Sequence, residues 1–178
     1  MRRTIAALGA VILACAVIVS TAGAARRHAA NATPPSAQDK TYLMSSMEGD
    51  LFEIIGGKLA LKKSHTPAVD ALAKRLIKDH TKSYHDVVKV AKELGVKVEK
   101  TPSPTETWEL LTVAKVSGTT FDQWYSSLEV YDHVQDIQET SDEIKDGSSA
   151  AVVSDAKQDL PMLKMHLKLS KATLRAVK

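Results

Sequence analysis

Cysteine is nearly absent from this sequence, since its 178 residues include only Cys15. Cys15 lies in an N-terminal segment that we expect to be removed. The remaining chain would then have no disulfide and no thiol chemistry, even in a compartment where disulfides form. We therefore expect a domain that is held together by packing alone.

The sequence also lacks a strong net charge and the motifs of nucleotide or hydrolytic enzymes. Its formal charge of +3 includes Arg2 and Arg3, which leaves the rest of the chain near +1. A nucleic-acid partner is not expected, because the sequence contains no basic stripe with interleaved aromatic residues. No glycine-rich phosphate loop and no arrangement of nucleophile, base and orienting residue can be recognised, so we predict no catalytic or cofactor-binding residues. An enzyme is the less favoured interpretation.

The first two dozen residues are typical of a secretory signal peptide. Arg2 and Arg3 precede an apolar run over residues 5–19, and Ala22-Gly23-Ala24 supplies small residues for cleavage after Ala24. We expect a signal peptide at 1–24, a disordered linker at 25–38, and export to the periplasm or the outside of the cell, with no stable membrane span after cleavage. The run is shorter than the roughly 20 residues that span a bilayer, but a retained membrane anchor through residues 5–19 is the alternative. A lipoprotein cut before Cys15 is a second alternative.

The rest of the chain, residues 39–178, is predicted to fold as one all-α domain. Apolar residues recur at spacings of three and four in four segments, which is the period of an amphipathic helix. Between the second and third segments, Pro102 and Pro104 interrupt a long connection that carries a short helix. These features predict a four-helix bundle of two helical hairpins joined by a crossover. The four long helices are expected at about Asp39–Ser64, Pro67–Leu94, Thr120–Asp146 and Ser149 to the C-terminus, with the short helix at Thr105–Val116.

The apolar pattern also predicts which faces are buried. The stripe of the first helix places Glu53 on the opposite side, so a carboxylate in water is slightly favoured over one that faces a second helix. The stripe of the last helix is interrupted by Pro161, which predicts a kink or a fresh start at Asp159. The residues expected to pack are Met44, Met47, Leu51, Ile54 and Ile55 in the first helix, Trp108, Leu111 and Val116 in the crossover, and Phe121, Trp124, Tyr125 and Leu128 in the third helix.

Histidines are the candidate functional residues, because some of them are expected to be buried. His80 lies inside the apolar stripe of the second helix, whereas His85 lies opposite the stripe and is expected to be solvent-exposed. A buried imidazole needs a carboxylate, a carbonyl, a water or a metal for each ring nitrogen. His133 follows Asp132, and periodicity leaves open which of the two points inward. His166 lies at the boundary of the buried face of the last helix.

Taken together, several short pieces resemble an exported bacterial family known as domain of unknown function 4142, which has a ferritin-like four-helix fold. They cover roughly Asp39 to Lys171. The resemblance implies the fold and the exported location, because the family has no established activity. The matching pieces are Glu53 with Lys58-Leu59-Ala60, Ala73 through Asp79-His80-Thr81, Ser117-Gly118 with Phe121-Asp122 and Tyr125, His133, and Leu160-Pro161 with Leu163 and His166.

The resemblance also indicates a metal site. Glu53, His80, His133 and His166 occupy matching family positions, one on each helix, and ferritin-like bundles build metal sites from inward carboxylates and histidines on facing helices. Three imidazoles and a carboxylate suit Zn²⁺, Cu²⁺ or Fe²⁺. A fourth ligand or a group that orients a ring would come from Glu53, Asp79, Glu129 or Asp132. No glutamate lies three residues before any of the three histidines, which argues against the usual di-iron site.

Two interpretations compete with the metal site. The same side chains could hydrogen-bond to one another across the helices and fix the helix register. Alternatively, an exported bundle with an N-terminal tether could be an envelope stress or adhesion module with no chemistry, whose protein partner the sequence does not name. The geometry distinguishes these interpretations, because ligands of one ion bring their ring nitrogens within about 4–5 Å of one point.

Overall fold

A computed structural model describes residues 34–178, and these residues form helices and no strand. The expected signal peptide at 1–24, the alternative anchor at 5–19 and most of the linker at 25–38 lie outside the described residues. The helices are α2 (Ala37–Lys63), α3 (Pro67–Glu93), α4 (Pro104–Val113), α5 (Gly118–Asp146) and α6 (Ala150–Ala176).

Local sequence signals begin and end these helices close to the expected positions. The Ser36 side chain caps α2 and Asp39 completes a reciprocal capping box, so this helix begins two residues earlier than predicted. Pro67 occupies the first turn of α3, and Gly95 follows its end at a φ of 68°, which a residue with a side chain rarely adopts. Pro161 lies within α6 and neither ends nor restarts that helix.

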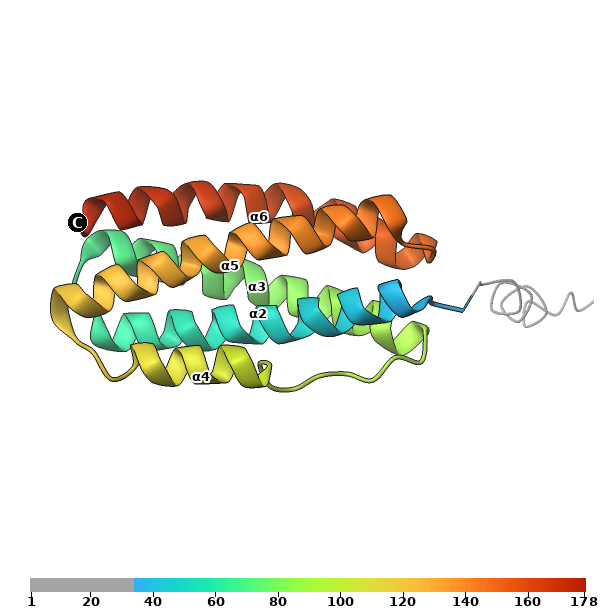
Figure 1. Ribbon diagram of the computed structural model, residues 1–178, viewed down its shortest axis with the longest axis horizontal. Coiled ribbons are helices and arrows are strands. Elements are labelled where there is room, and N and C mark those ends of the chain that lie inside the picture. Colours follow the sequence, from blue (N-terminus) through green and yellow to red (C-terminus); the bar gives the residue numbers. More distant parts are fainter. Residues whose placement is uncertain (1–33) are drawn as a thin grey trace, which may run out of the picture. The chain divides into compact units, whose positions relative to one another are not determined.

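The four long helices pack as two antiparallel hairpins, as Figure 1 shows. Helix α2 pairs with α3, and α5 pairs with α6. The two hairpins pack against each other through two further helix pairs, α2 with α5 and α3 with α6. The connection from α3 to α5 runs back along the bundle and carries α4, which lies against α2 and α5. The predicted all-α four-helix bundle with a crossover helix is confirmed.

A glycine sets the distance between α2 and α3. A Cβ atom built on Gly57 would lie 2.7 Å from Cγ1 of Ile77 and 3.1 Å from the carbonyl oxygen of Ala73. Both distances are shorter than ordinary van der Waals contacts, so only glycine fits without movement of α3. The close approach brings this part of the buried face of α2 against the facing side of α3.

The core consists of two apolar clusters that are separated along the bundle by a polar layer. One cluster is centred on Leu72, Leu76, Phe121 and Tyr125, and the other on Met47. Between them, each long helix contributes polar side chains that are less than a tenth exposed. These residues are Asp50 and Glu53 of α2, His80 and Ser83 of α3, Ser126, Glu129, Asp132 and His133 of α5, and His166 of α6.

The predicted buried face of α2 is right at Met47 and wrong elsewhere. Met44 is 42% exposed and Ile55 is 43% exposed, whereas the side chain of Glu53 is fully buried. The buried face of α2 consists largely of glycines and carboxylates, so hydrophobicity does not mark it. It includes Leu43, Met47, Gly49, Asp50, Phe52, Glu53, Gly56, Gly57 and Ala60.

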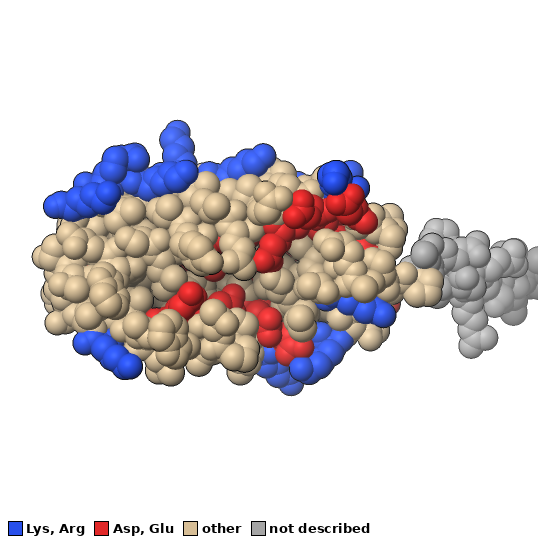
Figure 2. Space-filling view, viewed as in Figure 1, with Lys and Arg blue, Asp and Glu red and all other residues tan. Residues whose placement is uncertain are grey.

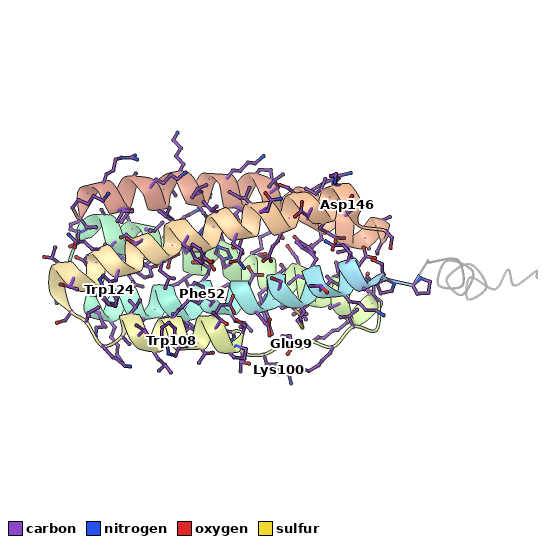
Figure 3. All side chains as sticks on the ribbon, viewed as in Figure 1. Phe52, Glu99, Lys100, Trp108, Trp124 and Asp146 are labelled. Carbon is purple, nitrogen blue, oxygen red and sulfur yellow. The ribbon has the colours of Figure 1, made fainter. Side chains whose placement is uncertain are left out.

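The predicted packing of the crossover is also only partly right. Val113 is the buried residue of α4, and Val116 packs against the same cluster, but Trp108 is 66% exposed and Leu111 is also exposed. Trp124 of α5 is exposed as well, and Figure 3 shows it with Trp108 toward the same end of the bundle. A short helix that packs on the outside of a four-helix bundle buries only a narrow stripe of its surface, so its outward-facing residues remain exposed to solvent. None of the helices within residues 34–178 combines the length and the apolar character needed to cross a membrane.

Candidate metal centre

Three imidazoles from three helices meet in the polar layer. His80 of α3, His133 of α5 and His166 of α6 are each at most 2% exposed. Their ring centroids lie 5.0–5.6 Å apart. One nitrogen from each ring can be chosen so that all three lie within 4.8 Å of one another. His85, one and a half turns after His80 on α3, is exposed as expected.

The ring of His80 is oriented by a carboxylate from α2. Nδ1 of His80 lies 2.7 Å from Oδ1 of Asp50, whose side chain is 4% exposed. Asp50 is a site residue that sequence reasoning missed. It lies one turn before Glu53, and a correct assignment of the buried face of α2 would have found it.

The ring of His166 is oriented by a carboxylate from α3. Oδ2 of Asp79 lies 3.0 Å from Nε2 of His166 and also pairs with Arg75. Burial acts to raise the pKa of Asp79, but the hydrogen bonds and charges of Arg75 and His166 outweigh it and lower the pKa. Asp79 is therefore a carboxylate that accepts the N–H of Nε2. The other nitrogen of this ring, Nδ1, then carries a lone pair, and it lies 3.2 Å from Nε2 of His80.

The ring of His133 is oriented by its own helix. A carbonyl oxygen can only accept, so the 2.8 Å contact with the backbone carbonyl of Glu129 places the proton on Nδ1 of His133. Nε2 therefore carries a lone pair. It is buried and has no hydrogen-bond partner among the described residues. Periodicity had left open whether Asp132 or His133 points inward, and both are buried.

Burial keeps the three imidazoles neutral. It lowers the pKa of His80 to about 4 and that of His166 to about 4. It also lowers the pKa of His133 well below the ordinary value, and the proximity of the other two rings adds to this effect. Neutral imidazole is the form that binds a metal ion, so at pH 7 the three side chains are in the protonation state that such binding requires.

A proton relay can satisfy part of this arrangement without a metal. Burial raises the pKa of Asp50, so Asp50 can hold a proton and donate it to Nδ1 of His80. Nε2 of His80 would then donate to Nδ1 of His166, and Nε2 of His166 would donate to Asp79. This chain uses every ring nitrogen of two histidines, but it leaves Nε2 of His133 without a partner.

A group of carboxylates lies beside His133. Oε1 of Glu53 is 3.4 Å from Nδ1 of His133, and Oε2 of Glu129 is 4.0 Å from the same nitrogen. Glu53, Glu129 and His133 form a second set whose possible ligand atoms all lie within 4.8 Å of one another. Glu53 thus groups with Glu129 and His133 and not with His80 or His166, and its predicted exposure to water is wrong. Asp132, which is 8% exposed, interacts with Glu53 from the next turn of α5.

A small polar cavity adjoins His80. Its volume is about 20 Å³, which is enough for one water-sized particle. Asp50 and His80 line it together with Asp136, Glu139 and Asp159. In the space-filling view, acidic side chains lie across the middle of the face, partly in its hollow, and lysine and arginine side chains lie along its edges (Figure 2). Four carboxyl groups, those of Asp50, Asp136, Glu139 and Asp159, thus line the cavity beside His80.

Comparison with known proteins supports the fold and assigns a family. The chain is similar to the crystal structure of a DUF305 fragment from Deinococcus radiodurans, with a TM-score of 0.71 at 12% sequence identity over 81% of this chain and 99% of that chain. At this identity the similarity concerns the fold alone. No curated protein matches the chain. The model of the family DUF4142, a domain of unknown function, matches residues 24–173, and the chain therefore belongs to the DUF4142 family.

Proposed function

We propose that this protein is exported and binds a divalent transition-metal ion through His80, His133 and His166. The observation that carries the proposal is the buried Nε2 of His133, which bears a lone pair beside two other imidazoles and has no hydrogen-bond partner. An unmade hydrogen bond in the interior costs about 1–3 kcal/mol, and coordination of a cation removes that cost.

The distances suit one ion after a small contraction. Ligand nitrogens at about 2.1 Å around a tetrahedral ion lie about 3.4 Å from one another. The contact between Nε2 of His80 and Nδ1 of His166 is already 3.2 Å, and the third ring nitrogen lies within 4.8 Å of both. To complete the set, the nitrogen of His133 would have to come closer to the other two by at most about 1.4 Å. Imidazole donors favour Zn²⁺, Cu²⁺ and Fe²⁺ over Mg²⁺ or Ca²⁺.

The outer partners of the rings support the same proposal. Metal-binding histidines usually donate their second nitrogen to a carboxylate or a backbone carbonyl, which fixes the tautomer. Asp79 and the carbonyl of Glu129 play this part for His166 and His133, and Asp50 is placed to do so for His80. On binding, a metal would displace the proton that the relay holds between His80 and His166.

The alternative is an exported interaction module in which this network is purely structural. The 3.2 Å contact between His80 and His166 favours it, because it completes a relay from Asp50 to Asp79. The relay would fix the register of α2, α3 and α6. It gives no role to His133, which is the reason that metal binding is preferred.

The test begins with the protein expressed with its own leader and purified without an affinity tag from the exported fraction. Mass spectrometry of the chain tests the predicted cleavage after Ala24, and elemental analysis measures bound metal. We expect about one transition-metal ion per chain and a lower melting temperature after chelation. His133→Ala should lose the metal. His85→Ala, which removes an exposed histidine of α3, should keep it. Substoichiometric metal in the wild type, together with a melting curve that chelation leaves unchanged, would defeat the metal proposal.

A further inference from the structure

Several carboxyl oxygens beside His133 have no hydrogen-bond partner and take no part in the proposed imidazole site. Both side-chain oxygens of Glu53, Oε2 of Glu129 and Oδ2 of Asp132 are buried without a hydrogen-bond partner. Glu53 and Glu129 are at most 1% exposed. Two adjacent helices, α2 and α5, thus aim carboxyl oxygens at one interior spot, and the hydroxyl of Tyr125 lies beside Glu129.

No basic side chain neutralises this group. Among the ion pairs of residues 34–178, Glu53 and Glu129 pair only with His133, and none involves Asp132. Burial and the neighbouring carboxylates raise the pKa of Glu53 well above its usual value. Burial, as the larger cause, raises the pKa of Glu129 to about 8 and that of Asp132 to about 7. Without a cation these carboxyl groups therefore hold protons, and a cation that displaced those protons would neutralise the group.

We propose that Glu53 and Glu129 form a second cation site, distinct from the three imidazoles, for a hard divalent ion of the Mn²⁺ or Fe²⁺ class. The two carboxylates and His133 place one possible ligand atom each within 4.8 Å of one another. With bonds of about 2.2 Å, two ligands on opposite sides of an ion are about 4.4 Å apart and two at right angles are about 3.1 Å apart, so the set would contract when an ion binds.

The donor types separate this site from the imidazole site. Oxygen ligands predominate here, because Asp132 stands at the edge of the pair and the hydroxyl of Tyr125 lies near Glu129. Carboxylate and phenolic oxygens favour harder ions, whereas three imidazoles favour Zn²⁺ or Cu²⁺. His133 belongs to both groups and lies between them. The second site does not require that the first be occupied, so the two proposals can fail separately.

The probe is Mn²⁺ alone, added to the metal-depleted mature protein at pH 8 and followed by the electron paramagnetic resonance of the free ion. We expect one tight site per chain. Glu53→Gln and Glu129→Gln keep the shape of each side chain and remove the charge, and each should weaken binding by at least about 10-fold.

Glu143→Gln is the matched control. Glu143 is a fully buried glutamate of the same helix α5, but it lies 14 residues after Glu129, which is about 21 Å along the helix axis. This variant should bind Mn²⁺ like the wild type. Melting curves of all three variants without metal show whether each one is folded.

Three results would overturn the second site. The first is a wild type that holds no Mn²⁺ at micromolar concentrations. The second is equal Mn²⁺ binding by the wild type and Glu53→Gln, which would assign the ions to surface acids. The third concerns Co²⁺, whose visible spectrum reports on imidazole coordination. If Glu53→Gln and Glu129→Gln weaken Co²⁺ binding and no separate Mn²⁺ site exists, the carboxylates belong to the imidazole site.

Discussion

Gly57 offers a sharp test of how the spacing of α2 and α3 supports the site. The perturbation is Gly57→Ala, and the control is Gly49→Ala on the same helix. A Cβ at position 57 would lie 2.7 Å from Cγ1 of Ile77 and 3.1 Å from the carbonyl oxygen of Ala73. A Cβ at position 49 would meet nothing closer than 3.8 Å. The two substitutions are chemically identical and differ only in the space around them.

The magnitudes follow from two opposing effects. Replacement of glycine by alanine inside a helix stabilises it by about 1 kcal/mol. An extra methyl group in a well-packed interior costs about 1–3 kcal/mol. At Gly57 the obstacles are a branch carbon of Ile77 and the backbone of α3, which cannot swing aside, so the net result should be a loss of about 1 kcal/mol. At Gly49 only the helix gain applies, and the protein should become about 0.5–1 kcal/mol more stable.

Urea unfolding of the two variants beside the wild type measures both effects. The free energies of unfolding should differ by at least about 1 kcal/mol between the variants, with opposite signs relative to the wild type. Gly57 lies one turn after Glu53, so a displaced α2 should also weaken metal binding in Gly57→Ala but not in Gly49→Ala. Equal changes of the same sign in both variants would refute the argument that the α2–α3 distance depends on this glycine.

Three further predictions concern the buried titrating groups and the orientation of a ring. The pKa of His80 is about 4 in the folded protein against 6.5 in the unfolded chain, so its stabilisation is complete above pH 6.5 and is lost as the pH falls toward 4. Between pH 7.5 and 5, the free energy of unfolding of the metal-free wild type, measured in urea, should therefore fall by about 2 kcal/mol more than that of His80→Asn. A difference between the two proteins that stays the same at both pH values would contradict this. Ionisation of Glu129 has the opposite effect on stability. Its pKa of about 8 in the folded protein lies above the unfolded value of 4.5, so this group destabilises the fold increasingly as the pH rises. Metal-free Glu129→Gln should be more stable than the wild type by up to about 4 kcal/mol at pH 8 and by less than about 1 kcal/mol at pH 5, and a pH-independent difference would count against a buried carboxyl. Asp79→Asn should weaken metal binding by about 10–100-fold in a competition titration, because it frees the ring of His166, whereas the exposed Asp86→Asn on the same helix should not.

The helices and their pairing could be predicted because the signals are local. Ser36, Pro67 and Gly95 mark helix ends through caps, a fixed φ and a left-handed backbone, and none of these depends on the rest of the fold. The long proline-interrupted connection before α5 predicted a crossover for the same reason. Such signals place each boundary within a few residues.

The orientation of α2 could not be predicted, because its buried face lacks the hydrophobic signal. Gly57 is buried because only a residue without a side chain fits against α3. Asp50 and Glu53 are buried among side chains of other helices. Periodicity then selects Met44 and Ile55, which lie on the solvent side. The error concealed Asp50, and it made Glu53 look like a surface residue. Only the resemblance to a family indicated that Glu53 had a role.

The distribution of unpartnered polar atoms argues that the polar layer exists to bind something. Of the thirteen buried side-chain atoms without a hydrogen-bond partner in residues 34–178, seven belong to polar-layer residues, which are Asp50, Glu53, Ser126, Glu129, Asp132 and His133. Each such atom costs about 1–3 kcal/mol, and a network kept for stability or register would satisfy its members. Relays of this kind account for His80 and His166 but leave the atoms around His133 unused. The two apolar clusters on either side stabilise the bundle, which would allow the layer between them to serve the proposed cation binding.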